Sequence, residues 1–217
     1  SDIKKIVKKS FRNHYKNRIE VLLFPKLTQN KTKKIISVVG LTHIEQALSK
    51  KNGAILLINH FGAGKLIMPA LGYLGYEINQ VAEKPTGSVV SNNRSSFISK
   101  KVRELELEFE GKLPAKFIYI SETLLPVFKC LNENKVLCLS FDGLLGNKKI
   151  PIKFLNREFS FSPGIITIAL RTQAPIVPAF VVRQKDNTHK LIIEEPVILN
   201  GSKKDIIDNL TRLAPIF

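Results

Sequence analysis

Residues 55–66 read Ile55-Leu56-Leu57-Ile58-Asn59-His60-Phe61-Gly62-Ala63-Gly64-Lys65-Leu66. The apolar run that opens this segment predicts a strand buried on both faces, as in a parallel sheet. The two glycines predict a tight turn, and a helix is expected to follow it. His60 then lies at the carboxyl end of a strand, where ligands collect in α/β sheets. This segment therefore predicts both the fold class and the position of a functional site.

Strands and helices alternate outward from this segment. Further strands are predicted at 35–40, 78–82, 117–120, 136–141, 175–182 and 191–194, and 149–154 is predicted as an edge strand. Helices are predicted at 42–50 with Thr42 as its cap, at 65–73, 94–109 and 123–131, and from Ser162-Pro163-Gly164 to Arg171. This order predicts an α/β fold with a mainly parallel central sheet flanked by helices on both faces.

Composition narrows the class of protein. The chain has 217 residues and a net charge of +16, which suits one domain and predicts an anionic partner. Acidic lipid headgroups or an acidic carrier protein fit better than nucleic acid, because no nucleic-acid-binding motif is visible. No apolar run approaches the length of a membrane span. Cys130 and Cys138 lie in apolar surroundings and predict buried reduced thiols, as in a cytoplasmic protein.

The first segment, residues 1–30, is predicted to contain a basic amphipathic helix that precedes the α/β domain at 31–217. Apolar residues recur at helical spacing between Ile3 and Leu22, and lysines and arginines fill the positions between them. Such a helix suits the interface of an anionic membrane. Alternatively, it packs on the domain with a solvated basic face.

Chemically active side chains follow several predicted strands. They are His60, Glu83 with its neighbour Lys84, and Asp142. Carboxyl ends of parallel strands meet at one edge of a sheet, so these groups are expected to lie near one another. A neutral imidazole takes a proton from a hydroxyl near pH 7, and His60 is therefore the expected general base. Gly62 and Gly64 allow close approach and leave backbone N–H groups for an oxyanion or phosphate.

Three other site types fit the sequence poorly. A phosphate-binding P-loop needs glycine at position 59 and serine or threonine at 66, where this chain has Asn59 and Leu66. No Gly-x-Ser-x-Gly nucleophile elbow occurs. The four histidines are too scattered to predict a metal site.

The segment around His60 resembles the first motif of the lysophospholipid acyltransferase superfamily, His-x4-Asp/Glu, and most closely that of lipid A secondary (lauroyl- or myristoyl-type) acyltransferases. Four further blocks resemble that branch in the same order along the chain. They are 39–48, Phe141-Asp142-Gly143, Phe154-Leu155-Asn156-Arg157 followed by Ser162-Pro163-Gly164, and 169–178.

The resemblance implies an acyltransferase without a cofactor, peripheral on the cytoplasmic face of the cell membrane. The donor would be a thioester of acyl carrier protein or CoA, and the acceptor a lipid or glycolipid hydroxyl or amine. Backbone at the glycine turn and at Gly164, with Lys65, Lys84 and Arg157, would bind the oxyanion or phosphate groups.

One departure from the family pattern concerns the motif acid, because Lys65 occupies its position. A carboxylate there would orient the imidazole, whereas a lysine disfavours the imidazolium form. Either Asp142 or Glu83 would have to take the place of that acid beside His60. The same departure supports a second hypothesis, in which the protein is a catalytically impaired relative that acts as a lipid- or carrier-binding scaffold.

Overall fold

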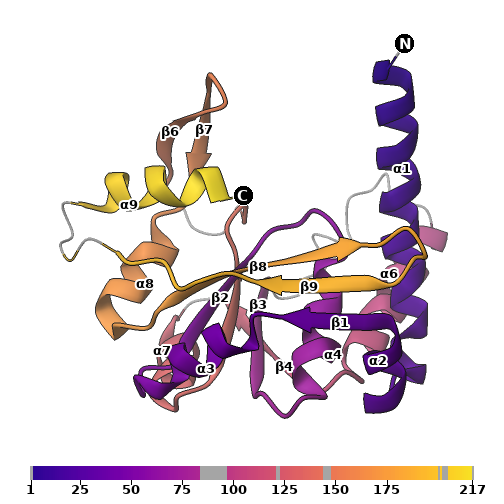
Figure 1. Ribbon diagram of the computed structural model, residues 1–217, viewed down its shortest axis with the longest axis horizontal. Helices are drawn as coiled ribbons and strands as arrows, with labels where there is room; N and C mark the ends of the chain where they lie inside the picture. The colour runs from indigo at the N-terminus through magenta and orange to yellow at the C-terminus, as the bar shows by residue number, and fades with distance from the viewer. Residues whose placement is uncertain are drawn as a thin grey trace.

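The computed structural model describes residues 2–83, 97–120, 123–143, 148–199, 201 and 205–216. Its centre is a seven-stranded sheet in the order β1-β9-β8-β2-β5-β3-β4 (Figure 1). The strands are β1 (Ile36–Val39), β2 (Ala54–Ile58), β3 (Ile78–Glu83), β4 (Ala115–Ile120), β5 (Val136–Ser140), β8 (Ile176–Arg183) and β9 (His189–Ile193).

The predicted mainly parallel sheet is confirmed. β2 pairs in parallel with β5 on one side and β8 on the other, and β3 pairs in parallel with β5 and β4. β9 is antiparallel to β8, and β1 runs parallel to β9. All five residues of β2 are buried, which is why its sequence is continuously apolar rather than alternating.

Helices cover both faces of the sheet, so the domain has three layers. Even-numbered residues of β2 point into a core with α3 (Leu41–Ser49), α4 (Ile67–Gly72) and the 3-10 helix η1 (Val21–Lys26). Odd-numbered residues of β2 face the second core, with α7 (Leu125–Asn132), α8 (Gly164–Thr172) and α9 (Ile206–Leu213). Cys130 and Cys138 are both buried free thiols, as predicted.

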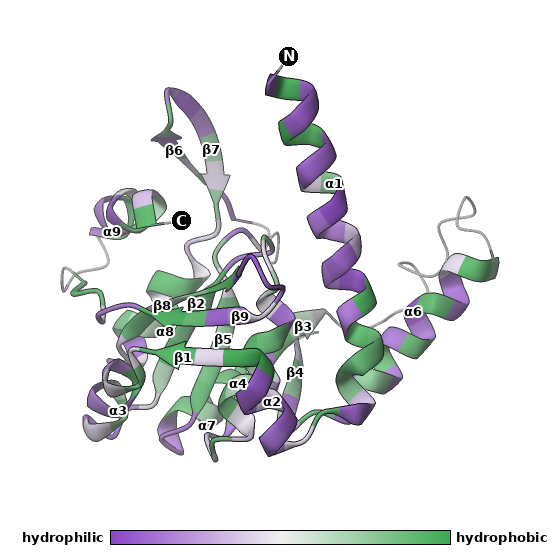
Figure 2. Cartoon of the chain, turned by 45° about the vertical axis from the view of Figure 1, so that its right-hand side comes forward, coloured by the Kyte–Doolittle hydropathy of each residue, from purple (hydrophilic) through white to green (hydrophobic). Residues whose placement is uncertain are grey.

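The N-terminal helix α1 (Asp2–Glu20) extends away from this three-layered body (Figures 1 and 2). None of its residues is buried, and large apolar side chains from Ile3 to Ile19 are exposed. The prediction that residues 1–30 begin with an amphipathic helix is confirmed. The apolar face of α1 does not pack on the domain, in contrast to the alternative arrangement. Contact with the body begins at its last turns and continues through η1, where Val21 and Phe24 are buried.

The structure differs from the sequence analysis at three places. The sequence analysis did not predict α2 (Gln29–Ile35), whose first turn is capped by the Thr28 hydroxyl, which accepts a hydrogen bond from the Lys31 N–H. Thr42 does not cap α3. The helix begins one residue earlier, and Gly40 in the left-handed conformation (φ +85°) is its N-cap.

The segment at 149–154 was also assigned wrongly, since it does not join the edge of the main sheet. β6 (Ile150–Phe154) instead pairs with β7 (Arg157–Phe161) in a separate antiparallel hairpin. Its two-residue turn has positive φ at both Leu155 and Asn156, which is the backbone of tight hairpin turns. α9, which the sequence analysis did not predict, packs against β6.

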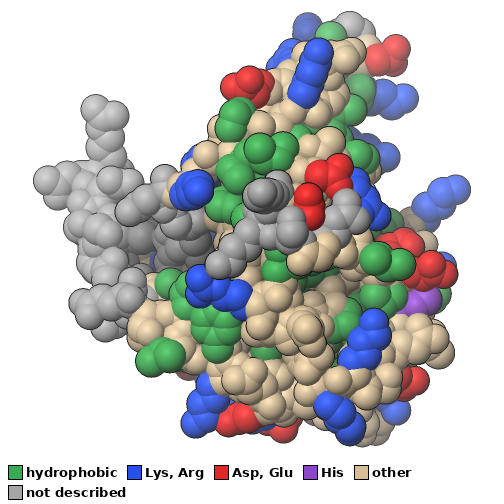
Figure 3. Space-filling model, turned by 90° about the vertical axis from the view of Figure 1, so that its left-hand side faces the viewer, with side chains coloured by type: hydrophobic (Ala, Val, Ile, Leu, Met, Phe, Trp, Pro, Cys, Tyr) green, Lys and Arg blue, Asp and Glu red, His purple; other side chains and the backbone are tan. Residues whose placement is uncertain are grey.

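Positive charge is distributed over the molecule as well as along α1. On the face shown in Figure 3, Lys and Arg side chains are spread among apolar ones, with Asp and Glu between them. Among the described helices, none combines the length and apolar character that a bilayer crossing requires.

Candidate active site

His60 and Asp142 follow the carboxyl ends of neighbouring strands. β2 and β5 are paired in register, with Ile58 opposite Ser140, and the Phe141 N–H donates to the Ile58 carbonyl at 2.7 Å. This last bond holds the two chain segments together just beyond the strands. The sheet thereby brings together two residues that are 82 positions apart in sequence.

The Asp142 carboxylate contacts both the backbone and the ring of His60. The His60 N–H donates to Asp142 Oδ2 at 3.0 Å, and Nδ1 of the ring lies 2.8 Å from Oδ1. A carboxylate only accepts hydrogen bonds, so this contact assigns the proton to Nδ1 and leaves Nε2 as the basic nitrogen. The His60 side chain is 70% exposed, and a substrate can therefore reach it.

The glycine turn that follows His60 has the predicted tight backbone. Gly62 has φ +68°, and a Cβ atom at this position would lie 2.7 Å from the Val181 carbonyl oxygen. A short 3-10 helix, η2 (Gly64–Leu66), begins two residues later. Among the described residues, no backbone hydrogen bond uses the amides of Gly62, Ala63 or Gly64 as donors. These three amides therefore have no backbone acceptor within the described part of the chain.

Lys65, at the position of the family's motif acid, bonds to a residue that the sequence analysis did not single out. Its Nζ lies 2.5 Å from Oε1 of Glu110 on α6 (Phe97–Glu110). The Glu110 side chain is only 9% exposed. The ammonium of Lys65, which the sequence analysis expected to bind phosphate groups, compensates this buried carboxylate.

A second buried carboxylate on α6 links the helix to α1. Arg18 donates from Nη2 to Glu106 Oε1 at 2.7 Å, and Arg103 from Nη1 to Oε2 at 3.3 Å. Burial alone raises the pKa of Glu106, but the hydrogen bonds from Arg18 and Arg103 and the charge of Lys65 together keep it below 4.5. α6 is therefore held to both α1 and the site by ion pairs.

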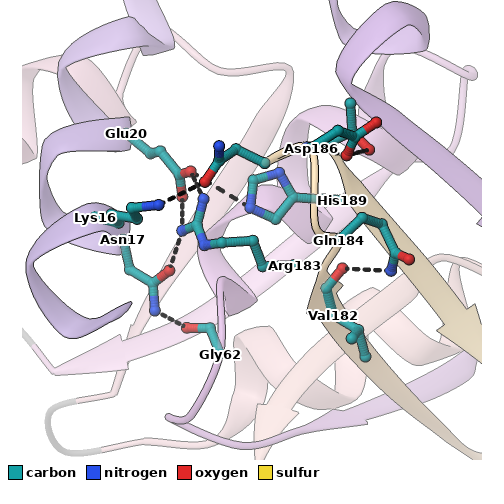
Figure 4. Close-up of polar contacts among 11 residues, drawn as sticks. Lys16, Asn17, Glu20, Gly62, Val182, Arg183, Gln184, Asp186 and His189 are labelled. Atoms are coloured by element: carbon teal, nitrogen blue, oxygen red, sulfur yellow. Dashed lines mark hydrogen bonds and ion pairs between the residues drawn. The ribbon is translucent and has the colours of Figure 1, made fainter. Parts of the chain in front are cut away.

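The last turns of α1 also reach the glycine turn. Asn17 Nδ2 donates to the Gly62 carbonyl at 2.6 Å, and Asn17 Oδ1 accepts from Arg183 Nη2 at 2.6 Å (Figure 4). Arg183 also pairs with Glu20 on α1. Sequence patterns gave no signal for these contacts, because Asn17 and Gly62 are 45 positions apart and belong to elements with no predicted pairing.

The remaining predicted site residues are not joined to His60 by any contact within the described part of the chain. Glu83 is the last residue of β3, but its side chain lies outside the described residues, as does the whole of Lys84. Arg157 is exposed at the start of β7. Gly164 begins α8, and its N–H donates to Ser162 Oγ at 3.3 Å. The described residues contain no group of three potential metal ligands.

Taken together, a histidine–aspartate pair and a glycine turn lie side by side at the carboxyl edge of an α/β sheet and define a candidate active site. The chain belongs to the bacterial lipid A biosynthesis acyltransferase family, whose model matches residues 2–217. A comparison with curated proteins found no match. Family membership supports an acyltransferase activity that acts on lipid.

Proposed function

We propose that this protein transfers a fatty acyl group from a thioester of acyl carrier protein or CoA to a hydroxyl or amine of a lipid or glycolipid. The observation that carries the proposal is the 2.8 Å contact between His60 Nδ1 and Asp142 Oδ1, in a chain of this family. In this proposal Asp142 replaces the motif acid as the partner that orients the imidazole.

The proposed reaction is a single acyl transfer. His60 Nε2 takes the proton of the acceptor hydroxyl or amine as its oxygen or nitrogen attacks the thioester carbonyl carbon. The resulting oxyanion is stabilised by amides of the glycine turn. The intermediate then collapses, the C–S bond breaks, and the leaving sulfur takes the proton from His60 Nε2, which returns to the neutral imidazole. An ester or amide and a free thiol are formed.

The exposed surface of α1 supports a membrane location for this reaction. Its large apolar side chains from Ile3 to Ile19 are exposed, and seven lysines and arginines occur from Lys4 to Arg18. Each basic residue near an anionic bilayer contributes about 1 kcal/mol to binding. We place the protein peripherally on the inner face of the cell membrane, where lipid acceptors are presented.

A direct assay tests the catalytic proposal. The purified protein is incubated with labelled acyl carrier protein or acyl-CoA and with candidate lipid acceptors, beside His60→Ala and the control His14→Ala on the exposed surface of α1. Removal of a general base should reduce turnover by about 100- to 10,000-fold, whereas His14→Ala should match the unmodified chain. Equal turnover by His60→Ala refutes the mechanism. A complete lack of turnover with every donor favours the scaffold hypothesis.

A further inference from the structure

We infer that Asn17 of α1 is a positioning residue for the acyl transfer proposed above, on which this inference rests. Its Nδ2 atom donates to the carbonyl of Gly62 at 2.6 Å, two residues beyond His60. Asn17 does not contact His60 or Asp142. It acts through the peptide between Gly62 and Ala63.

The orientation of the Asn17 amide is fixed by its second contact. A guanidinium group only donates hydrogen bonds, so the atom that Arg183 Nη2 contacts at 2.6 Å must be the Asn17 oxygen. The NH2 group is thereby directed at the Gly62 carbonyl. Arg183 is itself held by Glu20, whose Oε2 accepts from the same Nη2 atom at 2.9 Å. Figure 4 shows this chain of contacts from Glu20 through Arg183 and Asn17 to the turn.

The bond to Gly62 bears on the chemistry because a peptide group is planar and trans. The Ala63 N–H points opposite to the Gly62 carbonyl, so a donor that fixes the carbonyl also fixes the direction of that N–H. Ala63 is only 5% exposed, and within the described residues its amide has no backbone acceptor. This amide is one of those proposed to stabilise the oxyanion, and a hydrogen bond to the carbonyl also polarises its N–H.

Gly62 is held from a second direction by the body of the protein. The Val181 carbonyl oxygen lies 2.7 Å from the position that a Cβ atom on Gly62 would occupy, so the turn rests against β8 on that side. Asn17 supplies the contact from α1. The catalytic turn is therefore completed by a residue of the helix that carries the exposed apolar surface.

The test uses the isosteric substitution Asn17→Asp. The carboxylate keeps an acceptor for Arg183 but has no proton for the Gly62 carbonyl. We expect kcat to fall about tenfold, the effect of losing one hydrogen bond that acts in the transition state, with an unchanged KM for the acyl donor. Amide hydrogen exchange of the peptide containing residues 61–64 should become faster. The matched control is Asn187→Gly, which removes the neighbouring bond from Lys16 Nζ to Asn187 Oδ1, keeps the charge of Lys16, and suits the positive φ at this position; it should change neither quantity.

The outcomes distinguish failure of the positioning role of Asn17 from failure of the proposed acyl transfer. An unchanged kcat and an unchanged exchange rate in Asn17→Asp overturn the positioning role while the acyltransferase proposal stands. An equal loss in the Asn187→Gly control identifies a general loosening of the contact between α1 and the body, and also overturns the inference. If the unmodified chain turns over no donor, the proposed function fails and the reaction role of Asn17 fails with it. The rate of amide hydrogen exchange at residues 61–64 would then report only on the Asn17–Gly62 contact.

Discussion

Restoring the family's motif acid at position 65 should lower the folding stability of this protein. Lys65→Glu places a carboxylate beside Glu110, which is nearly buried and depends on the Lys65 ammonium at 2.5 Å. Loss of one partner of a fully buried ion pair costs about 3–5 kcal/mol. Lys65 is 46% exposed, and solvent screens such a pair, so we expect about 1–3 kcal/mol of lost stability.

The assay combines thermal unfolding with turnover. For a chain of this length the melting temperature should fall by about 2–4 °C for each kcal/mol lost. The swapped pair Lys65→Glu/Glu110→Lys should recover part of the loss in a double-mutant cycle. Turnover of Lys65→Glu should not rise, because Asp142 already occupies Nδ1 of His60. A stable Lys65→Glu variant with faster turnover would refute both the compensating role of Lys65 and the orienting role of Asp142.

Three further predictions follow from described contacts. Asp142→Asn should reduce kcat by about 100- to 10,000-fold in the acyl-transfer assay, since an amide NH2 facing Nδ1 of His60 stabilises the wrong tautomer; activity near that of the unmodified chain would contradict the pairing. Gly62→Ala should destabilise the fold by more than about 1 kcal/mol in denaturant unfolding, because φ is +68° and the new Cβ meets the Val181 carbonyl. Burial lowers the pKa of His189 from its usual value of 6.5, so the folded protein binds fewer protons at this residue than the unfolded chain does. The contribution of His189 to the free energy of unfolding should therefore be full above about pH 6.5 and should be lost as the pH falls through the lowered pKa. His189→Gln should flatten that slope in unfolding measured from pH 8 to pH 5, and an unchanged slope would exclude this residue as the cause.

Much of the fold was predictable because the central strands carry strong local signals. The apolar run of β2 and the turn residues around it indicate strand, turn and helix without reference to any partner. The same alternation along the chain indicates parallel pairing. Adjacent parallel strands then bring His60 and Asp142 to one edge, so Asp142 was already one of two candidates for the partner of His60.

Elements and contacts with weak local signals were missed. The turn between β6 and β7 is Leu155-Asn156 rather than the usual Asn-Gly, and most residues of β7 are exposed, so neither turn chemistry nor alternation marked the hairpin. The partner of Lys65 was also unpredictable. Glu110 is one of several acidic residues on a charged helix, and only the packing of α6 against the site selects it.

The two cysteines have a practical consequence for studying α1. Burial raises the pKa of Cys130 to about 11 and that of Cys138 to about 12, and only the thiolate reacts with alkylating reagents. The folded protein should therefore take up almost no maleimide at pH 7. A single cysteine introduced on the exposed surface of α1, as in Tyr15→Cys, should be labelled selectively without removal of either native thiol. A fluorophore attached there would report directly whether the helix enters an anionic bilayer.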